Sequence, residues 1–168
     1  DITETHELAE QLEHQARYDL LTHTFNRNHF EQELQQALKE VESHMRTHAM
    51  LFLDLDQLKV LNDTAGHEAG DAAILFSAGL LENVLPYNAV LARMGGDEFA
   101  ALLPCEDIDA LGRYCQQLHQ EVQRSAFSHA AHPDKKQVTL SIGATCFMPS
   151  RVGFPRAYEA ADNALYQV

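Results

Sequence analysis

Apolar side chains recur along the chain at two different spacings, and each spacing predicts a different kind of element. A spacing of three or four residues places apolar side chains on one face of an α-helix. This spacing predicts helices over residues 3–18, 28–43, 71–85, 109–124 and 157–166. Pro86 follows the third of these and ends it, because proline cannot continue a helix.

Short uninterrupted apolar runs have a different meaning, since they are typical of strands buried on both faces. Such runs predict strands at 50–53, 89–92 and 100–103, and residues 138–145 predict a fourth strand. Residues 19–27 carry turn-forming side chains and predict a turn, and the polar run 129–137 predicts a loop. The resulting order β-α-β-β-α-β is the ferredoxin-like arrangement. We therefore expect an α+β fold with a central, mostly antiparallel sheet flanked by helices.

The first predicted helix has only a thin apolar seam. Leu8 and Leu12 lie one turn apart, with glutamate and glutamine around them. A polar helix of this kind is typical of a coiled coil or a linker. We interpret residues 1–18 as a signalling or linker helix from an upstream partner domain, and residues 19–168 as a separate domain. The alternative is that these residues are an N-terminal extension without a function. The first residue is not Met, which indicates an excised fragment.

The connection between the two central strands has unusual chemistry. Gly95 and Gly96 predict a tight hairpin, since glycine supplies the positive φ that such turns need. Asp97 and Glu98 follow at once, with no lysine near them in the sequence to balance their charge. Two adjacent carboxylates are tolerated in a solvated polar turn, or they bind a divalent cation. Both interpretations are compatible with the hairpin alone.

Three stretches of sequence together resemble the GGDEF family, the diguanylate cyclases. The hairpin spells Gly-Gly-Asp-Glu-Phe at residues 95–99, which is the motif that names the family. Residues 19–27 are similar to the family's Asp-x-Leu-Thr-Gly-Leu-x-Asn-Arg motif, with His23 and Thr24 in place of glycine and leucine. Residues 54–71 match a longer polar block of the family. We expect the two departures in the first motif to alter the turn and to leave the chemistry unchanged.

The resemblance implies both a fold and a reaction. The fold is that of the nucleotidyl cyclases and the polymerase palm, and it covers the chain from about residue 19 onward. The reaction joins two GTP molecules into cyclic di-GMP with loss of two pyrophosphates. An antiparallel homodimer is implied as well, because each domain binds one GTP and supplies half of the site.

The resemblance also implies which residues bind metal. Asp54, Asp97 and Glu98 are implied to hold Mg²⁺ or Mn²⁺, with the carbonyl of Leu55 helping. Carboxylate oxygens suit such hard cations, and two ions can stabilise the attacking and leaving oxygens of a displacement at phosphorus. The three acids can meet only if the first predicted strand and the hairpin are neighbours in the sheet. The resemblance implies that Asp97 and Glu98 are also catalytic.

The nucleotide contacts are implied in the same way. Asn62 and Asp71 are assigned to the guanine base, whose N1 and N2 hydrogens a carboxylate can accept. Lys59 is the local cation for the triphosphate and is expected to be catalytic. The other expected substrate contacts are Leu58, which stands where an aromatic is usual, and Gly95 and Gly96. Without the family motif, Asn62 would be interpreted as a turn former and Asp71 as a helix N-cap.

Composition limits the partners further. Acidic residues outnumber basic ones 25 to 12, which gives a formal net charge of −13. That field repels long nucleic acids, and the sequence has no basic stripe, so we expect no nucleic-acid partner. Three cysteines without metal-ligand spacing fit a reducing cytoplasm. We expect a cytoplasmic protein, or the cytoplasmic domain of a larger, membrane-anchored one.

Two departures from the family pattern concern regulation and binding. The family's product-inhibition site is Arg-x-x-Asp, and the aligned residues here are Pro86-Tyr87-Asn88-Ala89. We expect no inhibitory site, since Pro86 and Ala89 replace the Arg and the Asp. The chain also ends at Val168, before the Lys and Arg side chains that help the family hold phosphates, so we expect weak nucleotide binding by this fragment.

Three functions remain open from the sequence. The first is an active diguanylate cyclase, because every residue that the family uses for catalysis is present. The second is a catalytically weak module that binds GTP and controls an attached EAL-type phosphodiesterase domain. The third is a structural dimerisation domain, which would not require the intact acids.

Overall fold

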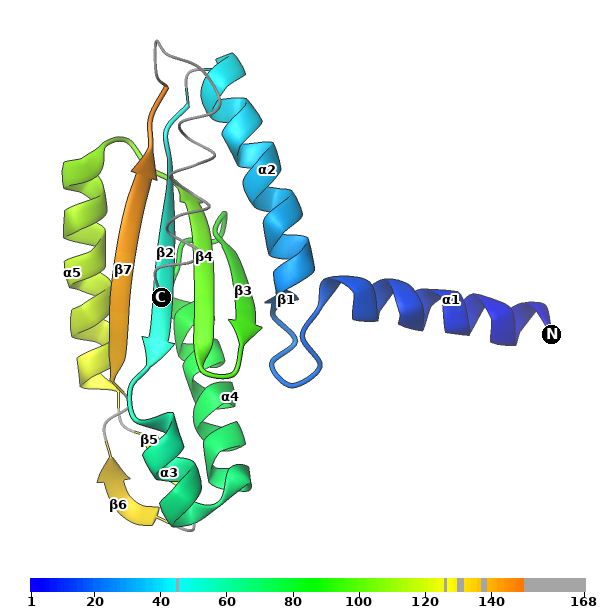
Figure 1. Ribbon diagram of the computed structural model, residues 1–168, viewed down its shortest axis with the longest axis vertical. Coiled ribbons are helices and arrows are strands. Elements are labelled where there is room, and N and C mark those ends of the chain that lie inside the picture. Colours follow the sequence, from blue (N-terminus) through cyan, green and yellow to red (C-terminus); the bar gives the residue numbers. More distant parts are fainter. Residues whose placement is uncertain (45, 126, 130–131, 137–138, 150–168) are drawn as a thin grey trace.

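A five-stranded mixed sheet forms the centre of the molecule (Figure 1). The structure, a computed structural model, describes residues 1–44, 46–125, 127–129, 132–136 and 139–149. The strand order is β1-β3-β4-β2-β7. The strands are β1 (Phe25–Asn26), β2 (His48–Leu55), β3 (Val90–Gly95), β4 (Glu98–Pro104) and β7 (Leu140–Phe147). All neighbours in the sheet are antiparallel except β1, which pairs with β3 in parallel.

The four long strands confirm the predicted ferredoxin-like arrangement. Their chain order is β2, β3, β4, β7, with two helices between β2 and β3 and one after β4, and their spatial order is β3-β4-β2-β7. All four predicted strands are present. All four extend beyond the predicted ranges at one end or both, and the ends of β2 and β4 carry polar residues such as Asp54 and Glu98. These polar ends turn out to form the candidate site.

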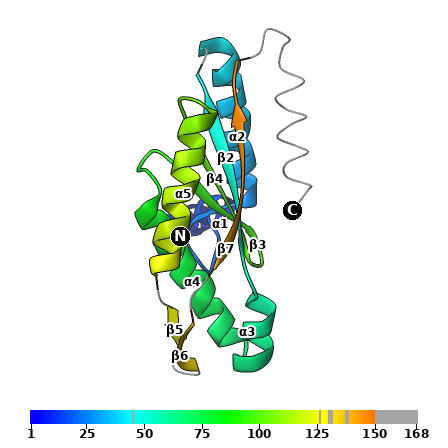
Figure 2. The same cartoon turned by 90° about the vertical axis from the view of Figure 1, so that its left-hand side faces the viewer.

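Helices cover both faces of the sheet (Figure 2). On one face lies α2 (Arg27–His44), and on the other lie α4 (His67–Val84) and α5 (Ile108–Arg124). Successive strand side chains point to opposite faces. Accordingly, Leu51 and Leu53 of β2 pack beneath α4 and α5, whereas Met50 packs beneath α2. The sheet therefore carries two hydrophobic cores, one on each face.

The first helix, α1 (Ile2–Arg17), projects away from the rest of the molecule (Figure 1). It has no buried residue. Its large apolar side chains are exposed, with Ile2 at 90%, Leu8 at 56% and Leu12 at 58%. The helix predicted over 3–18 is thus confirmed, and it makes little contact with the domain. Among the helices of the described ranges, none has the length and apolar character needed to cross a membrane.

The loop predicted over residues 129–137 was wrong. The structure has a separate two-stranded sheet here, formed by β5 (Phe127–His129) and β6 (His132–Lys136). Its sequence is too polar and too short to show the alternation that predicts strands. Phe127 anchors the first strand, because its buried ring lies 5.5 Å from the ring of Phe76 on α4.

Other differences concern element boundaries. The helix expected to begin at Asp71 begins four residues earlier, at His67, and the sequence did not predict α3 (Leu58–Ala65). Each of these helices follows a residue with positive φ, Gln57 at 63° and Gly66 at 86°. Gln57 separates β2 from α3, and Gly66 separates α3 from α4, by a change of backbone conformation alone. The spacing of apolar residues therefore does not reveal these boundaries. The helix predicted over 157–166 lies outside the described residues.

Candidate active site

The register between β2 and β4 brings together acidic residues that are distant in the sequence. Asp54 of β2 lies directly opposite Glu98, the first residue of β4. Cross-strand partners project from the same face of a sheet, so these two carboxylates share a face. The backbone N–H of Leu55 donates to the carbonyl of Asp97 at 3.0 Å, which ties the hairpin to β2. The structure thus gathers Asp54, Asp97 and Glu98 at one end of the sheet.

The electrostatics of this cluster oppose the ionisation of Asp54. Burial raises the pKa of Asp54, and the charges of Asp97, Glu98 and Asp56 raise it further. A hydrogen bond with the side chain of Asp97 acts in the same direction. A nearby cation would reverse these effects by favouring the carboxylate form. The cluster therefore favours a positively charged partner.

The donor chemistry of the cluster fits a hard divalent cation. In the part of the chain that the structure describes, no group of three His, Cys, Asp or Glu side chains is arranged to bind a metal ion by itself. Mg²⁺ is usually bound through one or two carboxylates together with waters and substrate phosphates. The oxygen ligands of the cluster therefore fit Mg²⁺ or Mn²⁺ that binds together with a nucleoside triphosphate.

Gly95 and Gly96 leave the tip of the β3–β4 hairpin open. Their φ angles are 146° and 51°, in the region that favours glycine. A Cβ atom placed on either residue would meet no other atom within 4 Å. The backbone of the tip is therefore accessible, as close approach to a phosphate requires.

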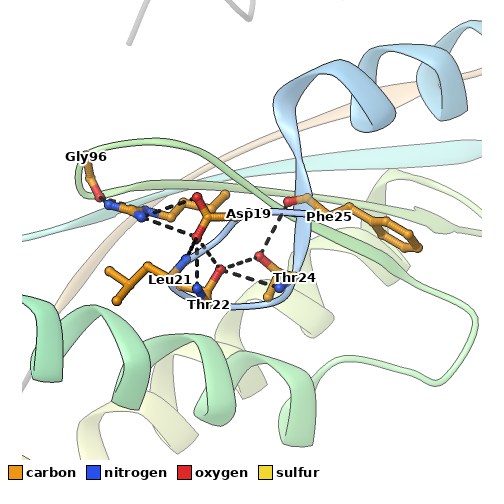
Figure 3. Close-up of polar contacts among 7 residues, drawn as sticks. Asp19, Leu21, Thr22, Thr24, Phe25 and Gly96 are labelled. Atoms are coloured by element: carbon orange, nitrogen blue, oxygen red, sulfur yellow. Dashed lines mark hydrogen bonds and ion pairs between the residues drawn. The ribbon is translucent and has the colours of Figure 1, made fainter. Parts of the chain in front are cut away.

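Arg93 connects this hairpin to the turn that follows α1, and Figure 3 shows the two ends of this connection, Gly96 and Asp19. Its Nε and Nη2 atoms donate to the carbonyl of Gly96, at 3.1 and 2.9 Å. Its Nη1 atom donates to both carboxylate oxygens of Asp19, at 3.3 and 3.2 Å. The sequence did not predict this contact, because Asp19 and Arg93 are 74 residues apart and no local pattern marks the pair.

The two predicted base-binding residues lie on neighbouring helices. Asn62 is part of α3, and the exposed Asp71 is part of α4. The amide of Asn62 lies against Gly70, where an added Cβ would overlap the amide oxygen and lie 2.8 Å from Cγ. Within the described part of the protein, the buried Oδ1 of Asn62 has no hydrogen-bond partner. A buried oxygen of this kind destabilises the fold unless a donor reaches it.

Local structural roles do not account for these two residues. The N-cap position of α4 is occupied by Gly66, and Asp71 lies inside the helix. Asn62 lies inside α3 and forms no turn. The alternative interpretations of Asp71 as an N-cap and of Asn62 as a turn former are therefore wrong.

The beginning of α3 contains the remaining predicted residues. Leu58 is only 9% exposed and belongs to the core beneath α4, which gives its side chain a packing role. Lys59, next to it, is exposed. Both follow the end of β2 closely, so they lie on the chain just after the acidic cluster.

The segment 86–89, where the sequence lacks the inhibitory motif, forms a turn before β3. The backbone N–H of Ala89 donates to the carbonyl of Pro86 at 2.9 Å. Tyr87 is fully exposed between them. The turn presents neither a guanidinium nor a carboxylate.

Fold and site together define a class of protein. A ferredoxin-like sheet carries an acidic cluster at its central hairpin, and α3 carries a buried amide oxygen without a partner among the described residues. The family described as "Diguanylate cyclase, GGDEF domain" matches residues 16–168. The chain therefore belongs to the GGDEF family of diguanylate cyclases, as its three motifs predicted.

Known relatives agree with this assignment. The probable diguanylate cyclase DgcE of Escherichia coli K12 is 47% identical over 104 residues, which are 62% of this chain and 9% of DgcE. The probable diguanylate cyclase DgcT of the same organism is 31% identical over 152 residues, which are 90% of this chain and 33% of DgcT. This chain thus spans only part of the length of these relatives.

A solved structure is similar over almost the whole chain. It is the coiled coil and GGDEF domain of DgcB from Caulobacter crescentus in complex with c-di-GMP. The TM-score is 0.82 at 30% sequence identity, covering 98% of this chain and 86% of the DgcB chain. This likeness confirms the predicted α+β fold.

Proposed function

We propose that this chain is the catalytic domain of a diguanylate cyclase that joins two GTP into cyclic di-GMP and releases two pyrophosphates. The observation that carries the proposal is the strand register that sets Asp54 opposite Glu98 and close to Asp97. Such a cluster suits phosphoryl transfer, where catalysis consists largely of positioning and charge stabilisation. Membership of the GGDEF family and the c-di-GMP complex of DgcB support it.

The acidic cluster has a defined role in this proposal. Asp54, Asp97 and Glu98 hold Mg²⁺ or Mn²⁺, with help from the carbonyl of Leu55. A cation held by these residues would supply positive charge to the phosphates. Lys59 adds a cationic side chain for the triphosphate. Because the hairpin tip has no side chains at Gly95 and Gly96, its backbone can approach the nucleotide.

In this proposal, two residues select guanine, Asn62 on α3 and Asp71 on α4. The carboxylate of Asp71 can accept from the N1 and N2 hydrogens of guanine, a donor pair that adenine lacks. Asn62 offers an amide whose oxygen has no partner within the described residues. A guanine donor would satisfy this oxygen. GTP is therefore the proposed substrate, and ATP is not.

The proposed reaction needs two copies of the chain. Each copy binds one GTP, and the 3′-hydroxyl of one GTP attacks the α-phosphate of the other. An antiparallel homodimer brings two such half-sites face to face. The exposed apolar side chains of α1, among them Leu8 and Leu12, are available for pairing between copies.

The regulatory context forms part of the proposal. An upstream sensor domain would act through α1, and an EAL domain could follow the chain. The turn at residues 86–89 offers no charged group for a product-inhibition site. We place the activity in the cytoplasm, where GTP is available and where free thiols such as Cys105 stay reduced.

The direct test is incubation with GTP and Mg²⁺, with chromatographic detection of cyclic di-GMP. Asp97→Ala is expected to abolish product and to leave the circular dichroism spectrum unchanged, because Asp97 lies in a partly exposed turn. Glu42→Ala, which removes an exposed acid of α2, is the matched control and should retain activity. Undiminished product from the Asp97 variant would refute the assignment.

The product assay together with melting curves distinguishes an active cyclase from the second function, a regulatory module that binds GTP. A GTP-binding regulatory module would show a GTP-dependent rise in melting temperature without product. A purely structural dimerisation domain would show neither.

A further inference from the structure

The tip of the hairpin is anchored by a side chain from its own first strand. Packing does not hold Gly95 or Gly96, since the space around a Cβ at either position is open. The carbonyl of Gly96 instead accepts two hydrogen bonds from the guanidinium of Arg93. Two donors of one rigid group fix the direction of an acceptor better than a single bond does.

Arg93 is itself held from its other side. It forms an ion pair with Asp19 in which the two side chains are only 15% and 21% exposed. A guanidinium presents five donors in a fixed planar fork and can serve a carboxylate and a carbonyl at once. The ammonium group of lysine cannot reproduce this arrangement.

Asp19 is fixed by the turn that follows α1. Its Oδ2 atom accepts from the backbone N–H groups of Leu21 and Thr22, at 3.2 and 2.9 Å, and from the hydroxyl of Thr22 at 2.9 Å. Burial by itself would raise the pKa of Asp19. The hydrogen bonds from Thr22 and the charge of Arg93 outweigh burial and hold that pKa below its usual value. Asp19 is therefore a charged partner for Arg93 at neutral pH.

The end of α1 is joined to the same turn. The backbone N–H of Tyr18 donates to the carbonyl of His14 at 3.0 Å, and the Nδ2 of Asn26 donates to the carbonyl of Gln15 at 3.2 Å. Asp19 follows Tyr18 directly in the sequence. A continuous series of contacts thus runs from the end of α1 through Asp19 and Arg93 to Gly96.

We propose that Arg93 is a positioning residue that couples the end of α1 to the Gly96 carbonyl and so sets the hairpin for phosphoryl transfer. This inference rests on the proposed cyclase function. The predicted base contacts, Asn62 and Asp71, lie on other elements, α3 and α4. Loss of Arg93 should therefore lower turnover much more than it weakens the binding of GTP.

The test compares three variants with the wild type. Arg93→Ala should lower kcat by about tenfold to a hundredfold, as expected for a small displacement of reacting groups, with KM for GTP changed less than about threefold. Arg93→Lys should restore only part of the activity. Arg124→Ala, which removes an exposed ion pair on α5, is the control and should change neither constant.

Hydrogen–deuterium exchange provides a readout that does not depend on catalysis. In the protein without nucleotide, Arg93→Ala and Asp19→Asn should speed amide exchange in a peptide covering residues 94–99, and Arg124→Ala should not. If the wild type makes no cyclic di-GMP, the proposed function fails and exchange alone decides the coupling. Unchanged exchange in the folded Asp19 and Arg93 variants, or a kcat within twofold of the wild type, would overturn it.

Discussion

At the scale of single residues, Asp54 links stability to function. Burial raises its pKa first, and neighbouring carboxylates raise it further. Because the folded-state pKa lies above the ordinary value of 3.8, the protonated form is favoured by folding. The contribution of Asp54 to stability is therefore fully present below pH 3.8 and is lost as the pH rises through the raised value.

Asp54→Asn is accordingly expected to increase thermal stability at pH 7 in the presence of a chelator, although it removes a proposed metal ligand. The increase should shrink as the pH falls toward 3.8, where the wild-type carboxyl becomes protonated too. Melting curves of both proteins over this pH range provide the measurement. Glu42→Gln is the control for loss of one negative charge, and a less stable Asp54 variant at pH 7 would contradict the electrostatic argument.

His23 is a second residue with a measurable effect. It stands where the family motif has glycine, and its φ is 58°. The left-handed conformation costs a residue with a Cβ about 1–2 kcal/mol, and the added flexibility of glycine offsets about half of that. His23→Gly should therefore raise the free energy of unfolding by about 0.5–1 kcal/mol in urea titrations. His23→Ala, which removes the ring and keeps the Cβ, should bring no such gain; equal stability of both variants would exclude backbone strain as the cause.

Single residues were predictable where a motif marks them. The acids of the hairpin and Asp54 could be named from the sequence alone, because their types and spacing are distinctive. Arg93 could not, and neither could Ser141, whose hydroxyl donates to Asp56 at 2.7 Å across 85 residues of sequence. Contacts of this kind depend on strand register and leave no local signal. The expectation that His23 would alter the turn remains a prediction.

At the scale of elements, the contact between α3 and α4 controls the position of the Asn62 amide. Gly70→Ala would place a methyl group on the Asn62 side chain. We predict that this substitution weakens GTP binding at least about tenfold, because the amide must turn away. Isothermal titration with GTP and a divalent cation measures the effect.

Gly79 provides the matched control on the same helix. A Cβ there meets no atom within 4 Å. Gly79→Ala should leave GTP affinity unchanged and should stabilise the protein by about 0.5–1 kcal/mol, since alanine favours helix. Equal GTP affinities of the Gly70 and Gly79 variants would show that Asn62 does not contact the base.

Elements were predictable where one face is strongly apolar. The four long strands of the main sheet and helices α2, α4 and α5 all follow hydrophobic patterns. By contrast, β1 is two residues long and β6 is polar, so neither produces a pattern of its own. The start of α4 was misplaced because Gly66 ends one helix and begins the next within a single polar block.

At the scale of the whole molecule, α1 is the part that we propose pairs with a second copy. Replacing Leu8 and Leu12 by Glu should reduce both dimerisation and cyclase activity. The melting temperature of the monomer should hardly change, because neither side chain is buried. Sedimentation equilibrium, activity assays and circular dichroism provide the three readouts.

The control for that experiment adds the same charge to α1 without removing apolar surface. Gln11→Glu together with Gln15→Glu meets this condition. An unchanged oligomeric state in the leucine variant, or an equal loss in the glutamine variant, would argue against pairing through these leucines. The boundary between the linker helix at 1–18 and the domain at 19–168 stays a prediction.

The isolation of α1 also bears on how such proteins diversify. A helix that buries nothing can be exchanged for another without disturbing the folding of the body to which it is attached. Only the short junction around Tyr18 and Asp19 has to be preserved, since its hydrogen bonds and the Asp19–Arg93 ion pair attach α1 to the domain. Recombination at this point would join the same domain to a different upstream helix in one step. Both parts would still fold as they did before.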